Sequence, residues 1–116
     1  MELFEQLVAL GVDVDSAMAR FMGNAQLLEM MYKKVPDSLN TNSDIIPHID
    51  AGDISQAIQK AHTLKGNMGN LSITPLFEAY TEIVNDLRAG NTAAAKEKLI
   101  EVKPVQDQIM AVIKKY

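Results

Sequence analysis

The chain has 116 residues, of which 47% are apolar and 22% charged, and a formal net charge of −4 at pH 7. This length suits one domain with a hydrophobic core, and the composition is that of a soluble globular protein. The absence of cysteine excludes disulfide scaffolds, thiolate zinc sites and cysteine nucleophiles. The acidic balance and the scattered lysines argue against a nucleic-acid-binding protein.

The first residues, MELFEQ, lack the basic start of a signal peptide. The longest apolar run is far too short for a membrane span. These features predict a soluble cytoplasmic protein without a membrane partner. Met1 and a completed helical plan favour a free-standing protein over a segment of a larger kinase.

Apolar residues recur at helical spacing along almost the whole chain, and no stretch alternates as a strand does. Two short helices are expected at the amino terminus, over residues 2–10 and 13–22. Gly11 and Gly23 end them, and Asp13 caps the second.

Asn24 is expected to cap a longer helix, which Pro36 either kinks or ends. The polar cluster at residues 40–43 predicts a loop. The next segment, residues 44–52, is expected to form a short irregular helical piece broken around Pro47.

Three further helix starts and stops are visible in the second half. Asp53 and Gln56 predict a capping box at the start of one helix. Thr74 is expected to cap the next, which ends at Gly90. A last helix is predicted over residues 92–115.

Four longer helices joined by short turns predict an all-α fold, an antiparallel up-down four-helix bundle formed by residues 24–115. The short helices of residues 1–23 are expected to cover one end or side of it. No repeat or linker is visible, so residues 1–116 are predicted to be one domain and a monomer.

His62 is predicted to face solvent. The apolar stripe of its helix places His62 about 120° from the stripe's centre. Its stripe consists of Ile54, Ala57, Ala61, Leu64, Met68 and Leu71.

The surface around His62 contains little side-chain bulk. Gly66 and Gly69 follow at helical spacing and share its face, although each glycine costs a helix about 1 kcal/mol. Ser55 and Gln59 precede His62 on that face. We interpret the glycines as steric access for a partner protein.

Lys65 lies one helical turn from His62, at the edge of the same face. A neutral imidazole is nucleophilic near neutral pH, and a neighbouring cation offsets the charge of an attached phosphoryl group. The arrangement favours a phosphoacceptor. The alternative is an ordinary exposed histidine beside a fraying helix end.

The stretch AHTLKGNMGNL, residues 61–71, resembles the signature of histidine-containing phosphotransfer domains, H-x-L-K-G followed by small residues and N-L-G. GVDVDSAMARFMGN, residues 11–24, resembles the segment that commonly opens bacterial members. The resemblance covers most of the chain. It implies a phosphorelay intermediate in two-component signal transduction, a phosphoprotein that is a phosphoryl carrier rather than an enzyme.

By this resemblance His62 accepts a phosphoryl group from an aspartate of one receiver domain and passes it to another. Lys65 stabilises the phosphate and Gly66 gives steric access. Ser55, Gln59 and Gly69 are expected to contact the partner. The implied partners are receiver domains of response regulators or of a hybrid histidine kinase. No cofactor or metal is implied on this chain, because any Mg²⁺ belongs to the receiver.

The chain departs from the family pattern at two places. Ser72 stands where the signature often ends in glycine. Val84 stands nearest the position at which some members place a glutamine against the imidazole, and Gln59 or a water is expected to substitute.

Two other functions remain as alternatives at this point. One is a phosphoacceptor module that a separate histidine kinase phosphorylates directly. The other is a helical adaptor that binds partners without phosphorylation. His48 is expected to have a surface or loop role, Tyr80 a packing role, and Met30 to lie away from the apolar stripe of its helix.

Overall fold

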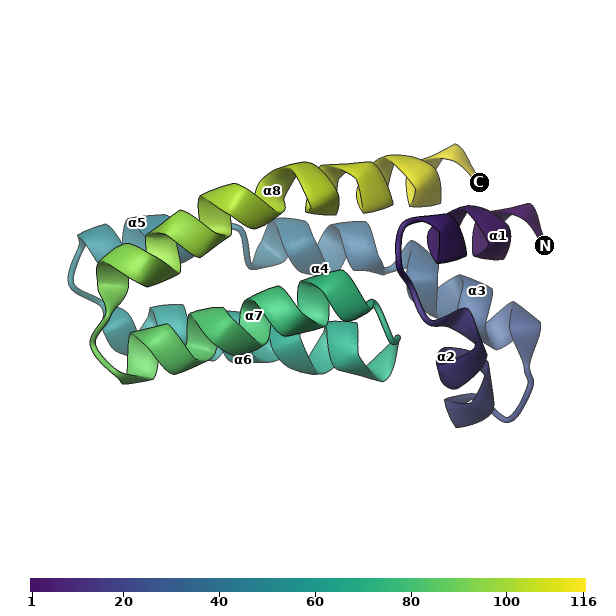
Figure 1. The fold of residues 1–116 in the computed structure, drawn as a ribbon, viewed down its shortest axis with the longest axis horizontal. Coiled ribbons are helices and arrows are strands. Elements are labelled where there is room, and N and C mark those ends of the chain that lie inside the picture. Colours follow the sequence, from purple (N-terminus) through teal and green to yellow (C-terminus); the bar gives the residue numbers. More distant parts are fainter.

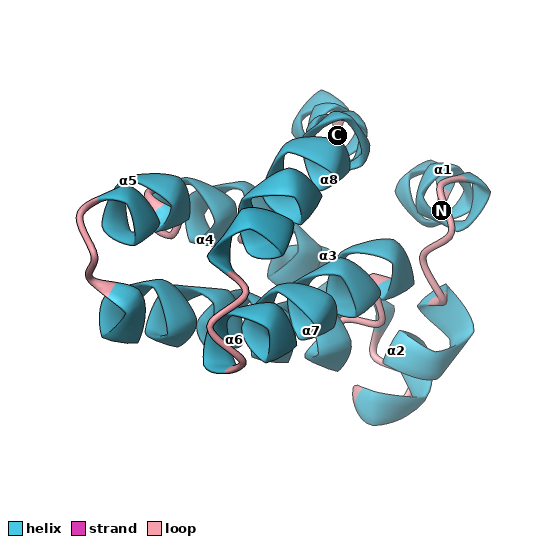
Figure 2. Ribbon diagram, turned by 60° about the vertical axis from the view of Figure 1, so that its left-hand side comes forward, coloured by secondary structure: helices cyan, strands magenta, loops and turns pink.

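The computed structural model describes all 116 residues as helices joined by short turns, with no strand (Figure 2). The all-α class is therefore confirmed. In chain order the helices are α1 (Glu2–Ala9), α2 (Val14–Arg20), α3 (Ala25–Lys33), α4 (Val35–Thr41), α5 (Ile45–Asp50), α6 (Ile54–Asn70), α7 (Thr74–Arg88) and α8 (Thr92–Lys115).

The three longest helices, α6, α7 and α8, follow one another along the chain and pack in sequence (Figure 1). Helix α7 folds back on α6, and α8 folds back on α7. Helices α3, α4 and α5 form a row of short helices, of which α5 packs on α6 and all three contact α8. Helices α1 and α2 lie at the end of the molecule that holds both termini. This arrangement leaves one side of α6 without a covering helix.

Side-chain caps begin three of the helices, as the sequence predicts. Asp13 accepts a hydrogen bond from the Ser16 N–H at 3.1 Å, and Asn24 accepts one from the Leu27 N–H at 3.0 Å. Asp53 accepts a longer bond from the Gln56 N–H. The capping box is wrong in its second half, because the Asp53 N–H donates to the His48 carbonyl instead of to a Gln56 side chain.

In the segment after Asn24, the structure decides between the two alternatives at Pro36. The helix ends and is not merely kinked: α3 ends at Lys33 and α4 begins at Val35, with Pro36 in the first turn of α4. Proline is tolerated there because the first N–H groups of a helix have no intrahelical partner. The same reason lets α5 continue through Pro47.

Two other boundaries also move. The expected loop at 40–43 starts later, since α4 extends to Thr41. Helix α7 starts one residue earlier than predicted, with Ile73 as its cap. Helix α8 has the predicted bounds and runs through Pro104 to Lys115 without interruption.

One continuous core of 28 buried apolar residues holds the helices together. The predicted stripes supply much of it. From α6, Ala57, Ala61, Leu64 and Met68 are all buried, and from α7 five stripe residues are buried: Leu76, Tyr80, Ile83, Val84 and Leu87. Because these faces are fixed by burial, the rotation of α6 about its axis is fixed as well.

The carboxyl end of α6 is tied to the amino-terminal helices. Ser72 follows the helix with φ +53°, a left-handed conformation that favours glycine. The Arg20 guanidinium donates to the Gly69 carbonyl at 3.0 Å and to the Ser72 hydroxyl. The buried Tyr32 hydroxyl donates to the Leu71 carbonyl at 3.0 Å. The bond from Tyr32 gives a partner to a carbonyl at the helix end that has none in the backbone, and Arg20 gives the Gly69 carbonyl a second partner beside the Ser72 N–H.

The whole molecule is elongated, with principal extents of 43 × 24 × 20 Å. No helix combines the length with the apolar character that a membrane crossing requires.

Candidate functional site

His62 lies near the middle of α6 on its exposed side, as the stripe predicts. Helix α6 spans 17 residues, so the imidazole is more than one turn from either end. Burial of Ala61 and Leu64 on the opposite side holds this orientation. The side chain therefore stands on a rigid element and is open to solvent.

His62 and Lys65 make no side-chain hydrogen bond or ion pair within the chain. Around them, the polar contacts of α6 are made by Lys60, Thr63 and Asn67. Lys65 is half-buried, so its stem lies along the protein surface while its ammonium group is unpaired. Lys65 follows His62 by three positions, which makes the two side chains neighbours on the helix surface.

Gly66 opens the surface beside the imidazole. A Cβ added at Gly66 meets no other atom within 4 Å, apart from its own helix backbone and chain neighbours. The space above this glycine is therefore accessible to another protein.

Gly69 has a different environment, and its expected role as bare surface is corrected. A Cβ added there lies 2.8 Å and 2.9 Å from two ring carbons of Phe77 in α7. The absence of a side chain at Gly69 therefore lets the Phe77 ring pack against the α6 backbone. The ring itself remains 36% exposed, so an aromatic edge rather than a gap borders this part of the His62 face.

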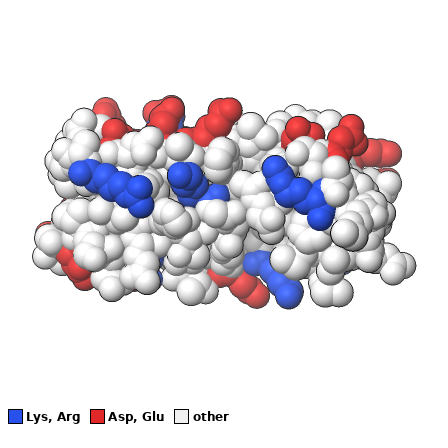
Figure 3. Space-filling view, turned by 90° about the horizontal axis from the view of Figure 1, so that it is seen from below, with Lys and Arg blue, Asp and Glu red and all other residues white.

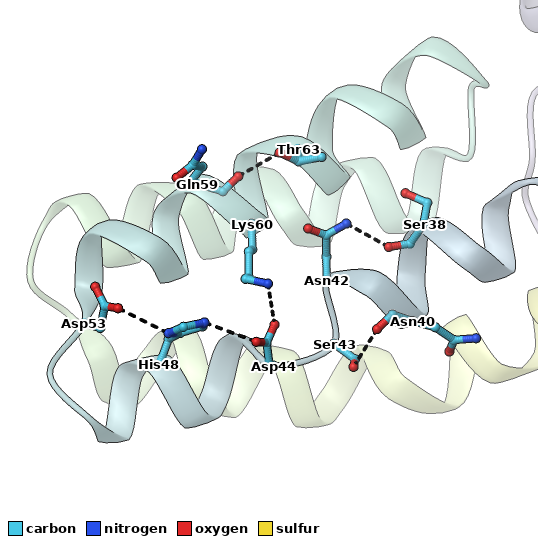
Figure 4. A network of polar contacts seen from close by, with 10 residues as sticks. All are labelled: Ser38, Asn40, Asn42, Ser43, Asp44, His48, Asp53, Gln59, Lys60 and Thr63. Atoms are coloured by element: carbon cyan, nitrogen blue, oxygen red, sulfur yellow. Dashed lines mark hydrogen bonds and ion pairs between the residues drawn. The ribbon is translucent and has the colours of Figure 1, made fainter.

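Ser55 and Gln59 lie on the exposed side of α6 before His62, as predicted. The Gln59 backbone carbonyl accepts a hydrogen bond from the Thr63 hydroxyl at 2.9 Å (Figure 4). Neither the Ser55 hydroxyl nor the Gln59 side-chain amide has a hydrogen-bond partner in the chain. Val84 is fully buried in the core and offers the imidazole no polar group.

His48 occupies a separate polar cluster that the sequence analysis missed (Figure 4). Its two ring nitrogens lie 3.2 Å from Asp44 and 3.4 Å from Asp53. Lys60 lies 2.8 Å from the other oxygen of Asp44. The hydrogen bond from Lys60 is the main cause that lowers the pKa of Asp44. The cluster joins α5 to α6, and the spacing of Asp44 and His48 on one helix face was its only sequence signal.

The cluster does not form a metal site, because no three His, Cys, Asp or Glu side chains in the chain are arranged so that they could hold a metal ion together. His48 also differs from His62 in access, since both of its ring nitrogens already have carboxylate partners.

A recess of about 210 Å³ opens where the α3–α4 break meets the carboxyl-terminal half of α6. Its wall includes the apolar side chains of Met31, Val35 and Met68, and its rim carries Lys34, Asn67 and Asn70. We call it the α6 recess. The Asn67 amide donates to the Ser38 hydroxyl at 2.8 Å and so links the two sides of the recess.

Charge is distributed unevenly around α6. The helix itself contains two lysines and no carboxylate. Seen from the α6–α7 side, Lys and Arg side chains are spread along the face, and Asp and Glu gather mainly toward its edges (Figure 3). An acidic partner is therefore attracted to this side more than the net charge of −4 suggests.

The site thus combines an exposed, unbonded imidazole, an unpaired lysine and an open glycine on one rigid helix. The geometry permits nucleophilic attack by the imidazole on a group that a second protein brings. Comparisons with protein-family models, with curated proteins and with solved structures gave no match to this chain.

Proposed function

We propose that this chain is a histidine phosphotransfer protein, which carries a phosphoryl group on His62 between receiver domains. One observation carries the proposal. The imidazole of His62 makes no hydrogen bond or ion pair within the protein, and it stands beside the unpaired Lys65 and beside Gly66, which has open space above it. The resemblance of residues 61–71 to the phosphotransfer signature gives the same function independently of the coordinates.

The chemistry is a reversible transfer between an acyl phosphate and an imidazole. A ring nitrogen of His62 attacks the phosphorus of a receiver's phosphoaspartate, a P–N bond forms and the P–O bond to the aspartate breaks. The electron pair of that bond leaves on the receiver's carboxylate. Reversal of this step on a second receiver completes the relay, and no redox change occurs.

The neighbours of His62 position the phosphoryl group and offset its charge, which are the main tasks of a protein in phosphoryl transfer. Lys65 supplies the positive charge on this chain. Gly66 leaves room for the receiver's aspartate loop. Some members of the family place a glutamine against the imidazole, at the position nearest Val84 in this chain. Gln59, which lies one turn before His62 and has no other side-chain partner, takes over that role. Any Mg²⁺ acts in the receiver's acidic pocket.

The fold that this function uses is a four-helix bundle. We assign the row α3–α5 as its first member and α6, α7 and α8 as the other three, with α1 and α2 covering one end. The packing of α6 on α7 and of α7 on α8 supports this assignment. The partners are receiver domains of response regulators or of a hybrid kinase, and the setting is the cytoplasm.

The deciding experiment is transfer of a labelled phosphoryl group from a phosphorylated receiver domain to wild type and to the His62→Gln variant. We expect label on wild type only, stable in base and lost in acid as a phosphoramidate should be. His62→Gln should keep the helical circular dichroism of wild type, because the side chain is exposed and unbonded. Label on neither protein, or equal label on both, would show that the chain is an adaptor or that His62 is not the acceptor.

A further inference from the structure

We infer that the receiver docks off-centre, over the carboxyl-terminal half of α6, with an apolar side chain in the α6 recess and a second contact on Phe77. This inference rests on the proposed function. The proposed function identifies the phosphorylated residue but not the surface that selects the partner, and the inference names that surface.

The recess lies within reach of any protein that contacts His62. An interface of standard size covers about 800 Å² on each partner, equal to a circular patch of about 16 Å radius. Asn70 follows His62 by eight residues, or about 12 Å along the helix axis. A receiver whose aspartate reaches His62, and whose interface extends toward the carboxyl end of α6, therefore covers the rim of the recess.

The larger apolar features near His62 lie on the carboxyl-terminal side. There the surface offers the recess, with Met31 and Met68 in its wall, and the exposed edge of Phe77. Toward the amino terminus of α6 the exposed positions are the polar residues Ser55, Gln56 and Gln59, Ile58 is only partly exposed, and no recess opens beside them. Fully desolvated pockets that take one apolar anchor supply most of the affinity of ordinary interfaces.

Charge favours the same direction. At the amino-terminal end of α6 the carboxylates of Asp50 and Asp53 lie against Lys96 and His48, and no unpaired cation adjoins this end. The carboxyl-terminal half adjoins the unpaired Lys34 on the recess rim, and Arg20 lies against the last carbonyls of the helix. A receiver's phosphorylation pocket is acidic, so it is attracted more strongly to the carboxyl-terminal half.

The first test compares two bulky substitutions at similar distances from His62. Asn70→Phe fills the rim of the recess, whereas Gln56→Phe adds the same side chain about 9 Å to the other side. Both positions are exposed, and neither side chain has a hydrogen-bond partner. We expect Asn70→Phe to raise the receiver's Kd, and its KM in transfer, about tenfold with kcat little changed. Gln56→Phe should leave both within about twofold of wild type.

The second test uses charge and adds no bulk. Lys34→Glu should weaken receiver binding, and Lys114→Glu on the exposed end of α8 should not, although both change the net charge equally. Circular dichroism on all four variants identifies any that fail to fold, and either pair alone decides the question.

The outcomes separate this inference from the proposed function. If wild type accepts phosphoryl groups but the two members of each pair behave alike, or Gln56→Phe is the more damaging, the docking inference is wrong and the relay function stands. If wild type neither binds nor accepts a phosphoryl group from any receiver, both are wrong.

Discussion

At the scale of single residues, the two glycines of α6 have unlike structural reasons. Gly66 has open space where a side chain would stand, so nothing in the fold requires it. Gly69 accommodates the ring of Phe77 at a distance that any Cβ would violate. The second glycine is therefore explained by packing between α6 and α7, whereas packing gives no reason for the first, which the proposed function assigns to access for a partner.

This difference predicts opposite stability changes. Gly66→Ala should stabilise the protein by about 0.5–1 kcal/mol, because alanine is the better helix former. Gly69→Ala should be at least about 1 kcal/mol worse than Gly66→Ala, because the methyl group displaces the Phe77 ring and loses its packing. Urea unfolding of both variants measures the difference.

Repeating Gly69→Ala in a Phe77→Ala background is the control. Without the ring, the two alanine substitutions should have the same effect, as coupled neighbours show non-additive free energies. A persistent difference between them would mean that Gly69 is required by something other than Phe77.

At the scale of helices, the turn after α6 depends on a residue in an unfavourable conformation. Ser72 has φ +53°, which costs a residue with a Cβ about 1 kcal/mol. Its hydroxyl accepts a hydrogen bond from Arg20 and its carbonyl accepts one from the Asp13 N–H at 2.9 Å. Serine in place of the signature's glycine thus exchanges backbone freedom for a bond to α2.

Substitutions at Ser72 should separate these two effects. Ser72→Ala keeps the strained conformation and loses the bond to Arg20, so the free energy of unfolding should fall. Ser72→Gly loses the same bond but relieves the strain, and should be more stable than Ser72→Ala by about 1 kcal/mol. Thermal unfolding of the two variants beside wild type measures this. Equal stability of the two would show that residue 72 carries no strain in solution.

The buried faces of the helices could be predicted from sequence, whereas their breaks and mutual contacts could not. Periodicity identified the stripe of α6 and so the exposure of His62, because one helix face decides both. The end of α3 at Lys33 did not follow, since proline is compatible with a kink as well as with a new helix. Phe77 lies at the edge of its helix stripe, and only the packing of α7 on α6 shows that its ring meets Gly69. The α6 recess likewise arises between segments far apart in the chain.

At the scale of the whole molecule, two buried tyrosines couple folding to alkaline pH. Burial raises the pKa of both Tyr32 and Tyr80 from the ordinary value of 10.0 to about 12. The neutral form of each is held in the core, and the Tyr80 hydroxyl donates to Gln106 at 2.6 Å. The unfolded chain releases these protons first, near pH 10, so it gains stability relative to the folded state as pH rises from 10 to 12.

The free energy of unfolding should therefore fall between pH 10 and pH 12. Each tyrosine contributes up to about 1.4 kcal/mol per pH unit in this window and nothing to the slope well below pH 10. Tyr80→Phe should remove about half of the tyrosine-dependent slope while lowering neutral-pH stability through the lost bond to Gln106. Urea unfolding at several alkaline pH values tests this. An unchanged slope in Tyr80→Phe would show that its hydroxyl is not protected in the core.

The exposed side of α6 is the only surface through which His62 can be reached. This limits the order in which two partners can exchange a phosphoryl group with His62 in the proposed relay. In the proposed relay, a donor receiver and an acceptor receiver that both need the same imidazole exclude one another. A chain with this proposed function must therefore release the first receiver before it engages the second, and so alternates between a free and a phosphorylated form. Steady-state transfer should follow double-displacement kinetics, and an excess of unphosphorylated acceptor should inhibit loading by occupying the shared surface.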